Sequence, residues 1–178
     1  LSGSSIILDS AEHDRTILTY KGINDKVLMK DIKKFNTKWL YFSSLLGQSF
    51  ATQKKIAGIF VKKRTKIAFN PSEYLIKSYN LMFLLKLVYI LILNKDEAEL
   101  LSKKKNIDEI FSVLYAMGPR IIVITDKNNL IVCYDGTKKY SIIPHKIKVV
   151  ERTGAGDAFA SGFVAGIIAG KSINDSLR

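Results

Sequence analysis

The segment richest in potential chemistry is Thr153-Gly154-Ala155-Gly156-Asp157-Ala158-Phe159. Its glycines permit a tight turn, and the pattern predicts a helix over residues 154–169 directly afterwards. The first N–H groups of a helix lack partners and lie at the positive end of its dipole, so the turn predicts an anion hole for a phosphate. Asp157 falls in the first helical turn, where its carboxylate could accept a proton from a hydroxyl that attacks a γ-phosphate.

The same segment also fits a simpler interpretation, a glycine-rich helix start in which Asp157 is favoured only by the dipole. Two other phosphate-binding motifs are excluded. A Walker loop would need Gly-Lys-Ser/Thr, which does not follow, and Phe159 fills the place of the third glycine in a dinucleotide-binding fingerprint.

A second candidate site is Asn94-Lys95-Asp96-Glu97, which follows the strand predicted over residues 88–93. Asn94 is therefore expected at the carboxyl end of a sheet strand, where ligands of α/β proteins bind. Glu97 lies one helical turn further and can face the same way. An amide oxygen and a carboxylate together suit Mg²⁺, bound through waters. The alternative is an N-cap asparagine with a capping-box glutamate.

A third candidate is the pair Thr125-Asp126, at the end of the strand predicted over residues 120–125. A hydroxyl in this position could meet a nucleotide phosphate, and a simple strand-ending turn is the alternative. His13 and His145 lie far apart in the sequence without ligand partners, and both are expected at the surface.

Strands and helices alternate along the chain and must position these candidates. Short apolar runs predict strands at residues 39–43, 66–69, 88–93 and 120–125. Helices are predicted at residues 29–35, 48–63, 95–101, 106–117, 154–169 and from 173 onward. Such an alternation predicts an α/β fold with a parallel sheet covered on both faces. A hairpin is expected at residues 130–143, and the strands at residues 5–8 and 16–20 predict a separate flap.

Composition limits the classes to which the chain can belong. It has 178 residues, 47% of them hydrophobic, which suits one domain with a core, or one domain with a small appendage. The single cysteine, Cys133, cannot form an internal disulfide, which fits either the reducing cytoplasm or a fold that does not depend on the compartment. It lies in an apolar run, so we expect it to be buried. We expect a cytoplasmic protein. The strongest apolar stretch, residues 81–93, contains Lys86 and is too short to span a bilayer, which needs about 20 residues.

The net charge of +12 raises the question of nucleic-acid binding. However, the lysines are scattered in small groups and are not interleaved with aromatic residues, as a base-stacking platform would require. We therefore expect a solvated lysine-rich surface and no nucleic-acid or membrane partner. A positive field would still attract an anionic nucleotide.

The segment 153–159, followed by Gly162-Phe163 and Gly166, resembles the C-terminal signature of the ribokinase-like (PfkB) carbohydrate kinases. Asn94-x-x-Glu97 is similar to the Asn-x-x-Glu motif of that family, and Phe69-Asn70-Pro71 and Gly22-x-Asn24 look like further landmarks. The resemblance implies a three-layer α/β/α sandwich with a parallel central sheet and a small β lid, truncated at both ends. Residues 1–24 would be part of the lid and residues 25–178 part of the kinase core.

The resemblance also implies a reaction, the transfer of the γ-phosphate of ATP to a hydroxyl of a sugar, sugar phosphate or nucleoside. Asp157 would be the general base, with an anion hole formed by the backbone of Gly154, Ala155 and Gly156. Nucleotide contacts are implied for Asn94, Thr125 and Asp126, and Mg²⁺ contacts, through waters, for Glu97 and Asn94. Glu151 and Thr153 match positions near a monovalent-cation site for an ion such as K⁺. An exposed lid edge could pair with a second lid, giving a homodimer.

Some positions depart from the family pattern. Glu151-Arg152-Thr153 stands where Asp-Thr-Thr is usual, and Lys127 and Leu130 stand where glycines are common. These departures motivate a second hypothesis, a catalytically impaired relative that binds nucleotide or sugar as a sensor. A third hypothesis, a basic nucleic-acid-binding module, would require an affinity that falls steeply with salt.

Overall fold

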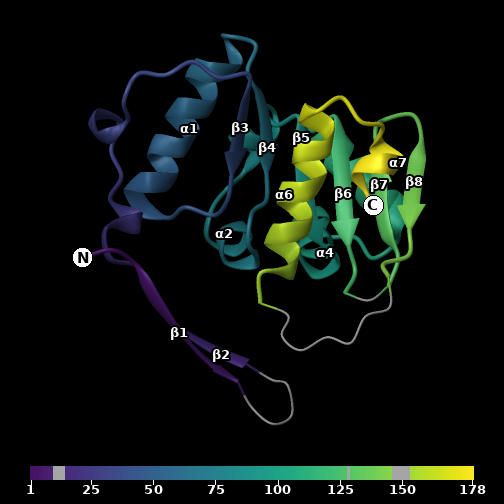
Figure 1. Ribbon diagram of the computed structural model, residues 1–178, viewed down its shortest axis with the longest axis horizontal. Coiled ribbons are helices and arrows are strands. Elements are labelled where there is room, and N and C mark those ends of the chain that lie inside the picture. The colour runs from purple at the N-terminus through teal and green to yellow at the C-terminus, as the bar shows by residue number, and fades with distance from the viewer. Residues whose placement is uncertain (10–14, 128, 146–152) are drawn as a thin grey trace.

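The computed structural model of this chain describes residues 1–9, 15–127, 129–145 and 153–178. The first element is a two-stranded antiparallel sheet, in which β1 (Ser4–Asp9) pairs with β2 (Arg15–Tyr20). It projects away from the rest of the molecule (Figure 1), and apolar side chains on both of its faces are exposed. The separate flap expected from the sequence is therefore confirmed as a structural element.

The main sheet has six strands in the order β3-β4-β5-β6-β7-β8. Their bounds are β3 Trp39–Phe42, β4 Lys66–Phe69, β5 Ile90–Asn94, β6 Ile121–Thr125, β7 Ile131–Tyr134 and β8 Lys139–Ile142. The first four strands run parallel, and β7 and β8 add an antiparallel hairpin at one edge. The predicted parallel strands and the predicted hairpin are both confirmed.

Helices cover both faces of this sheet (Figure 1). One face packs against α1 (Gly47–Val61), α2 (Glu73–Ser78), α3 (Met82–Leu85), α4 (Lys95–Ser102) and α5 (Ile107–Ala116). The other face packs against α6 (Ala155–Ile168) and α7 (Ile173–Ser176). Among the helices that the structure describes, none is long and apolar enough to cross a membrane.

Alternate side chains of the central strands enter two separate cores. In β5, Leu91 and Leu93 pack with α1 to α5, whereas Ile90 and Ile92 pack with α6 and α7. This alternation follows from the pleat of a strand, whose successive side chains point to opposite faces. Because both faces of β5 are covered, nearly all of its residues are apolar. Helices on both faces of the sheet confirm the predicted three-layer α/β/α sandwich.

The structure corrects two expectations about helices. Residues 29–35 do not form the predicted helix, since only a 3₁₀ turn, η2 (Met29–Asp31), is present, after a similar turn, η1 (Gly22–Asp25). The Asp31 carboxylate accepts the backbone N–H of Leu28, which caps the start of this turn. The turn ends at Ile32, where the backbone is already extended. The sequence analysis also missed α2, a short helix whose N-terminus is capped by Ser72.

The boundary proposed after residue 24 remains a prediction. The Ile23 N–H donates to the carbonyl of Leu1, which joins this loop to the start of β1. The Ser49 hydroxyl donates to the Asn24 carbonyl at 2.5 Å, which joins the same loop to α1. Residues 22–24 therefore contact both the hairpin and the sandwich.

Cys133 lies in β7 and is fully buried, as expected. Burial, with a smaller contribution from the charge of Asp135, raises the pKa of its thiol to about 12. A thiol that stays protonated is a poor nucleophile, so Cys133 is a packing residue.

Asp135 closes the turn between β7 and β8. Its carboxylate accepts the backbone N–H groups of Thr137 (2.9 Å) and Lys138 (2.7 Å) and the hydroxyl of Tyr140 (2.8 Å). Burial raises the pKa of Asp135, but these hydrogen bonds outweigh it and hold the pKa at about 2. Because this pKa lies below the unfolded value of about 3.9, the stabilisation is present above pH 4 and is lost as the pH falls through about 2.

Replacing Asp135 with alanine is expected to lower the free energy of unfolding by about 1 kcal/mol at pH 7, a modest effect because water screens this carboxylate. Urea unfolding of both proteins should show this difference shrinking as the pH is lowered from 4 toward 2. Asp135→Asn also lacks the titrating carboxyl, so its difference from the wild type should follow the same pH dependence, with a smaller loss at pH 7 because the shape of the side chain is kept. A loss that stayed constant across this range would contradict the assignment.

Candidate active site

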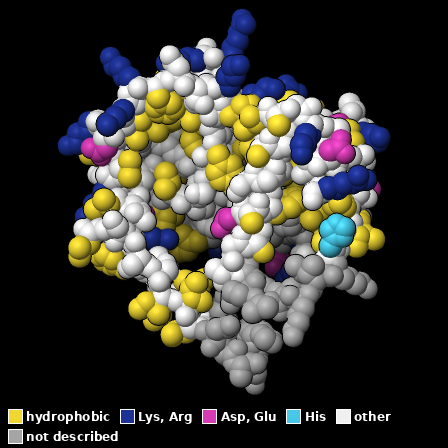
Figure 2. Space-filling model, viewed as in Figure 1, with side chains coloured by type: hydrophobic (Ala, Val, Ile, Leu, Met, Phe, Trp, Pro, Cys, Tyr) yellow, Lys and Arg dark blue, Asp and Glu magenta, His cyan; other side chains and the backbone are white. Residues whose placement is uncertain are grey.

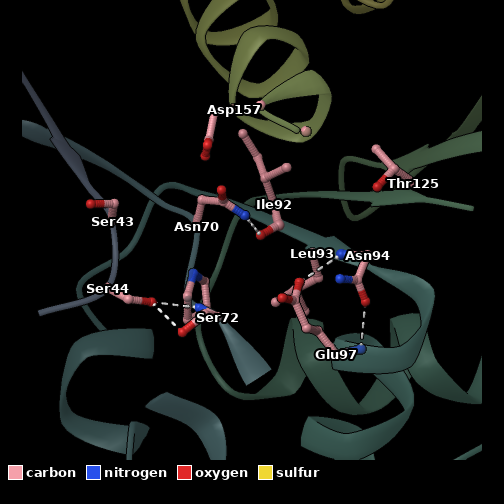
Figure 3. A pocket seen from close by; sticks show the side chains of 13 residues that line it. Ser43, Ser44, Asn70, Ser72, Ile92, Leu93, Asn94, Glu97, Thr125 and Asp157 are labelled. Atoms are coloured by element: carbon pink, nitrogen blue, oxygen red, sulfur yellow. Dashed lines mark hydrogen bonds between the residues drawn. The ribbon is translucent and has the colours of Figure 1, made fainter. Parts of the chain in front are cut away.

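The candidate residues meet at one cavity of about 480 Å³, at the carboxyl ends of the parallel strands (Figure 3). Six residues singled out in the sequence line it: Asn94, Glu97, Thr125, Gly154, Gly156 and Asp157. They come from the ends of β5 and β6, from α4 and from the start of α6. The sheet brings these segments together because its parallel strands, β3 to β6, end at the same edge.

The start of α6 places both a glycine-containing turn and a carboxylate at this cavity. Gly154 precedes the helix with φ +82°, a left-handed conformation that favours glycine. A Cβ atom added at Gly154 or Gly156 would meet no atom of the described residues within 4 Å, apart from its own chain neighbours and helix backbone, so this backbone is open to a ligand. The Asp157 carboxylate projects from the first turn toward the cavity (Figure 3). After burial, its charge is the second cause that raises the pKa of Tyr41 in β3.

Asn94 and Glu97 form the capping box that was the alternative interpretation of this motif. The Asn94 Oδ1 accepts the Glu97 N–H, and the Glu97 Oε2 accepts the Asn94 N–H, each at 2.8 Å. Burial raises the pKa of Glu97, and hydrogen bonds from the N–H groups of Asn94 and Glu73 oppose that rise. The capping box does not exclude a role in binding, because it holds both side chains at the cavity wall.

Of the predicted pair Thr125-Asp126, only Thr125 lines the cavity. Thr125 lies opposite Asn94 in the register of β5 and β6, and it lines the cavity. The Asp126 carboxylate is not part of the cavity wall, since it contacts Lys95 Nζ at 3.4 Å and Asn129 Nδ2 at 3.2 Å. Lys127, which stands at a position that is commonly glycine in the family it resembles, has φ +48°, the backbone conformation that glycine favours.

Comparison with known proteins shows the family to which this chain belongs. The sequence pattern of the pfkB family carbohydrate kinases matches residues 2–178, nearly the whole chain. The chain belongs to the pfkB family of carbohydrate kinases. A cytidine kinase of Thermococcus kodakarensis is 30% identical over 131 residues, which is 71% of this chain and 47% of that protein.

Solved structures show the same fold at low sequence identity. An adenosine kinase from Anopheles gambiae, in complex with P1,P4-di(adenosine-5) tetraphosphate, superposes with a TM-score of 0.88 at 19% identity, covering 98% of this chain and 59% of that one. A ribokinase from Thermotoga maritima gives a TM-score of 0.78 at 16% identity, with 98% and 59% covered. The chain thus spans about half to three-fifths of the length of these relatives.

The polar residues at the ends of β3 and β4 were not predicted to belong to the site of this pfkB family member. The Asn70 Nδ2 donates to the Ile92 carbonyl at 2.9 Å, and the hydroxyls of Ser44 and Ser72 are hydrogen-bonded at 2.8 Å. The side chains of Asn70, Ser44 and Ser72 give this part of the cavity wall its polar groups (Figure 3). Two signals were available in the sequence. Asn70 follows the strand at residues 66–69, and Phe69-Asn70-Pro71 resembles a landmark of the family.

The described residues fit a magnesium ion held mainly by phosphates and water. Within the described parts of the chain, no group of three or more histidine, cysteine, aspartate or glutamate side chains could hold a metal. Mg²⁺ in phosphate-transferring sites needs only one or two protein oxygens besides substrate phosphates and waters. Asn94 and Glu97 supply groups of that kind. Of the predicted monovalent-cation pair, Thr153 directly precedes Gly154, and Glu151 lies outside the described residues.

Proposed function

We propose that this protein transfers the γ-phosphate of ATP to a hydroxyl of a sugar, sugar phosphate or nucleoside, with Asp157 as the general base. One observation carries the proposal. The carboxylate of Asp157 and the start of α6 share a single cavity with Asn94 and Glu97, although these groups come from distant parts of the chain. A kinase needs this combination, because a base must lie beside the phosphate that the acceptor attacks.

Each side chain then has a defined task. The oxygen of the acceptor hydroxyl forms a bond to the γ-phosphorus, and the bond from that phosphorus to the leaving ADP oxygen breaks. Asp157 accepts the proton that the hydroxyl loses. The N–H groups of Gly154, Ala155 and Gly156 hold the transferred phosphoryl group at the positive end of the α6 dipole. Asn94, Thr125 and the turn at Asp126 contact the nucleotide. Asn94 and Glu97 hold waters of a magnesium ion that, when bound, neutralises phosphate charge.

The β1–β2 hairpin is assigned to the lid. Its exposed apolar side chains, among them Ile6, Leu8 and Leu18, would cover the acceptor and exclude water during transfer. Its free strand edges could also pair with the hairpin of a second copy, giving a homodimer. The monovalent-cation site at Glu151 and Thr153, and a cytoplasmic location, remain predictions.

The alternative is a relative that binds nucleotide or sugar as a sensor without transferring phosphate. It is favoured by the replacement of glycine by Lys127 and Leu130. However, Lys127 keeps the left-handed backbone that glycine favours, and neither residue lines the cavity. Because neither residue lines the cavity, these two replacements do not by themselves argue against catalysis.

Turnover distinguishes the two functions. The protein, expressed from its complete reading frame, should convert ATP to ADP with magnesium only when a suitable sugar, sugar phosphate or nucleoside is present, and label from [γ-³²P]ATP should appear in that acceptor. Tight ATP binding without any labelled product across the panel would favour the sensor. Absence of both binding and transfer would refute the kinase and the sensor together.

A further inference from the structure

The charge of the cavity wall is opposite to what a nucleotide needs. The two charged side chains that line it are those of Asp157 and Glu97, and no lysine or arginine among the described residues lines it. The chain nevertheless carries a net charge of +12. Figure 2 shows that most lysine and arginine side chains on this face lie around its periphery, away from the central hollow. The helix dipole supplies only about half a positive charge against a triphosphate.

Among the described residues, Lys95 is the cation that lies nearest in sequence to the cavity wall. It follows Asn94 directly, as Asp126 follows Thr125, and Asn94 and Thr125 lie opposite each other and both line the cavity. The Lys95 Nζ is 3.4 Å from the Asp126 Oδ2, so the ion pair bridges the carboxyl ends of β5 and β6. The Lys95 side chain is 50% exposed, which leaves it free to take a different partner.

We propose that Lys95 binds the phosphates of the nucleotide and that Asp126 holds its ammonium group while the site is empty. This assignment rests on the proposed kinase function. Partner exchange is easy because exposed ion pairs contribute little to stability. A magnesium-bound triphosphate still offers more negative charge than one carboxylate, and the flexible stem of lysine allows its ammonium group to move. Asp126 keeps a second partner, the Asn129 amide, after Lys95 leaves.

A purely structural role for the ion pair predicts something different. If Lys95 only tied the loop after β6 to α4, removing either charge would loosen the same loop, and both changes would weaken phosphate binding. If Asp126 competes with the phosphates for Lys95, the two changes have opposite signs. Removing the lysine weakens binding, and neutralising the aspartate strengthens it.

The test uses inorganic tripolyphosphate titrated by calorimetry into the protein expressed from its complete reading frame, so that the readout does not depend on turnover. Lys95→Ala is expected to weaken binding about tenfold, as loss of a charge-assisted hydrogen bond does. Lys95→Arg should retain most of the affinity, and Asp126→Asn should tighten binding severalfold. Lys105→Ala is the matched control, because it removes the same charge from an exposed pair with Glu99 and should change binding less than twofold.

Kinetics add a second readout. If the protein is a kinase, Lys95→Ala should raise the KM for ATP and leave the KM for the acceptor nearly unchanged. Equal tripolyphosphate binding by the wild type and Lys95→Ala, weaker binding by Asp126→Asn, or no binding by the wild type would overturn the assignment. If phosphate transfer is absent but the variants bind with the expected opposite signs, the kinase proposal fails and Lys95 remains a phosphate-binding residue.

Discussion

Replacing Asp157 with asparagine is expected to lower kcat by about 10²- to 10⁴-fold, the range in which general-base catalysis contributes. Asparagine has nearly the same shape as aspartate, so α6 and its backbone N–H groups should keep their positions. Asparagine cannot accept the proton of the acceptor hydroxyl, so this proton must be transferred to water instead. The KM values for ATP and the acceptor should change much less than kcat, because the base acts mainly in the transition state.

Steady-state kinetics with varied ATP and acceptor would measure this effect. Asp175→Asn is a matched control, since it makes the same change at an exposed residue of α7 and should leave kcat within about twofold. A kcat for Asp157→Asn within a few-fold of the wild type would reject Asp157 as the base.

Tyr41 offers a check on Asp157 that does not depend on activity. Burial and then the negative charge of Asp157 raise the pKa of the Tyr41 phenol, because a nearby anion disfavours the phenolate. In Asp157→Asn the second cause is removed, so the pKa of Tyr41 should fall while remaining raised by burial. A spectroscopic titration of Tyr41 that is identical in both proteins would show that the Asp157 carboxylate does not lie close enough to Tyr41 to affect its pKa.

Replacing Phe163 with alanine is expected to lower the free energy of unfolding by about 3–5 kcal/mol, the usual cost of deleting a buried phenylalanine side chain. Phe163 lies on α6 and is 1% exposed in the core between α6 and the sheet. Its ring lies 6.3 Å from the Phe159 ring, so its loss would leave a cavity between the helix and the strands. The effect is large because this face of the sheet is covered by α6 and α7 alone among the described helices.

Chemical denaturation would measure the loss, with Phe83→Ala as the matched control. Phe83 lies on α3 and is 53% exposed, so the same truncation there should cost less than about 1 kcal/mol. If both variants lost equal stability, the packing of α6 against the sheet would not be the main support of this layer. The comparison bears on function, since α6 carries Asp157 and Gly154 to the cavity.

The sequence was informative where a local rule sufficed. Apolar runs bounded by polar residues identified the parallel strands, because a strand covered on both faces has apolar side chains on both sides. The sequence placed Gly154–Asp157 at a helix start and Asn94–Glu97 after the carboxyl end of a strand. Both placements were possible because the residues at these positions themselves signal where a helix begins and a strand ends. The short helix predicted at residues 29–35 is wrong, because the backbone is already extended at Ile32 and only a single 3₁₀ turn forms.

The sequence by itself therefore determined the layers of the fold and the two motifs at its ligand-binding edge. Tertiary structure alone decided that the two motifs share one cavity, that Asn70 is anchored to Ile92, and that Asp126 is held by Lys95. These contacts join residues that are far apart in the chain. No local pattern encodes contacts of this kind, because they depend on how neighbouring strands align once the core has packed.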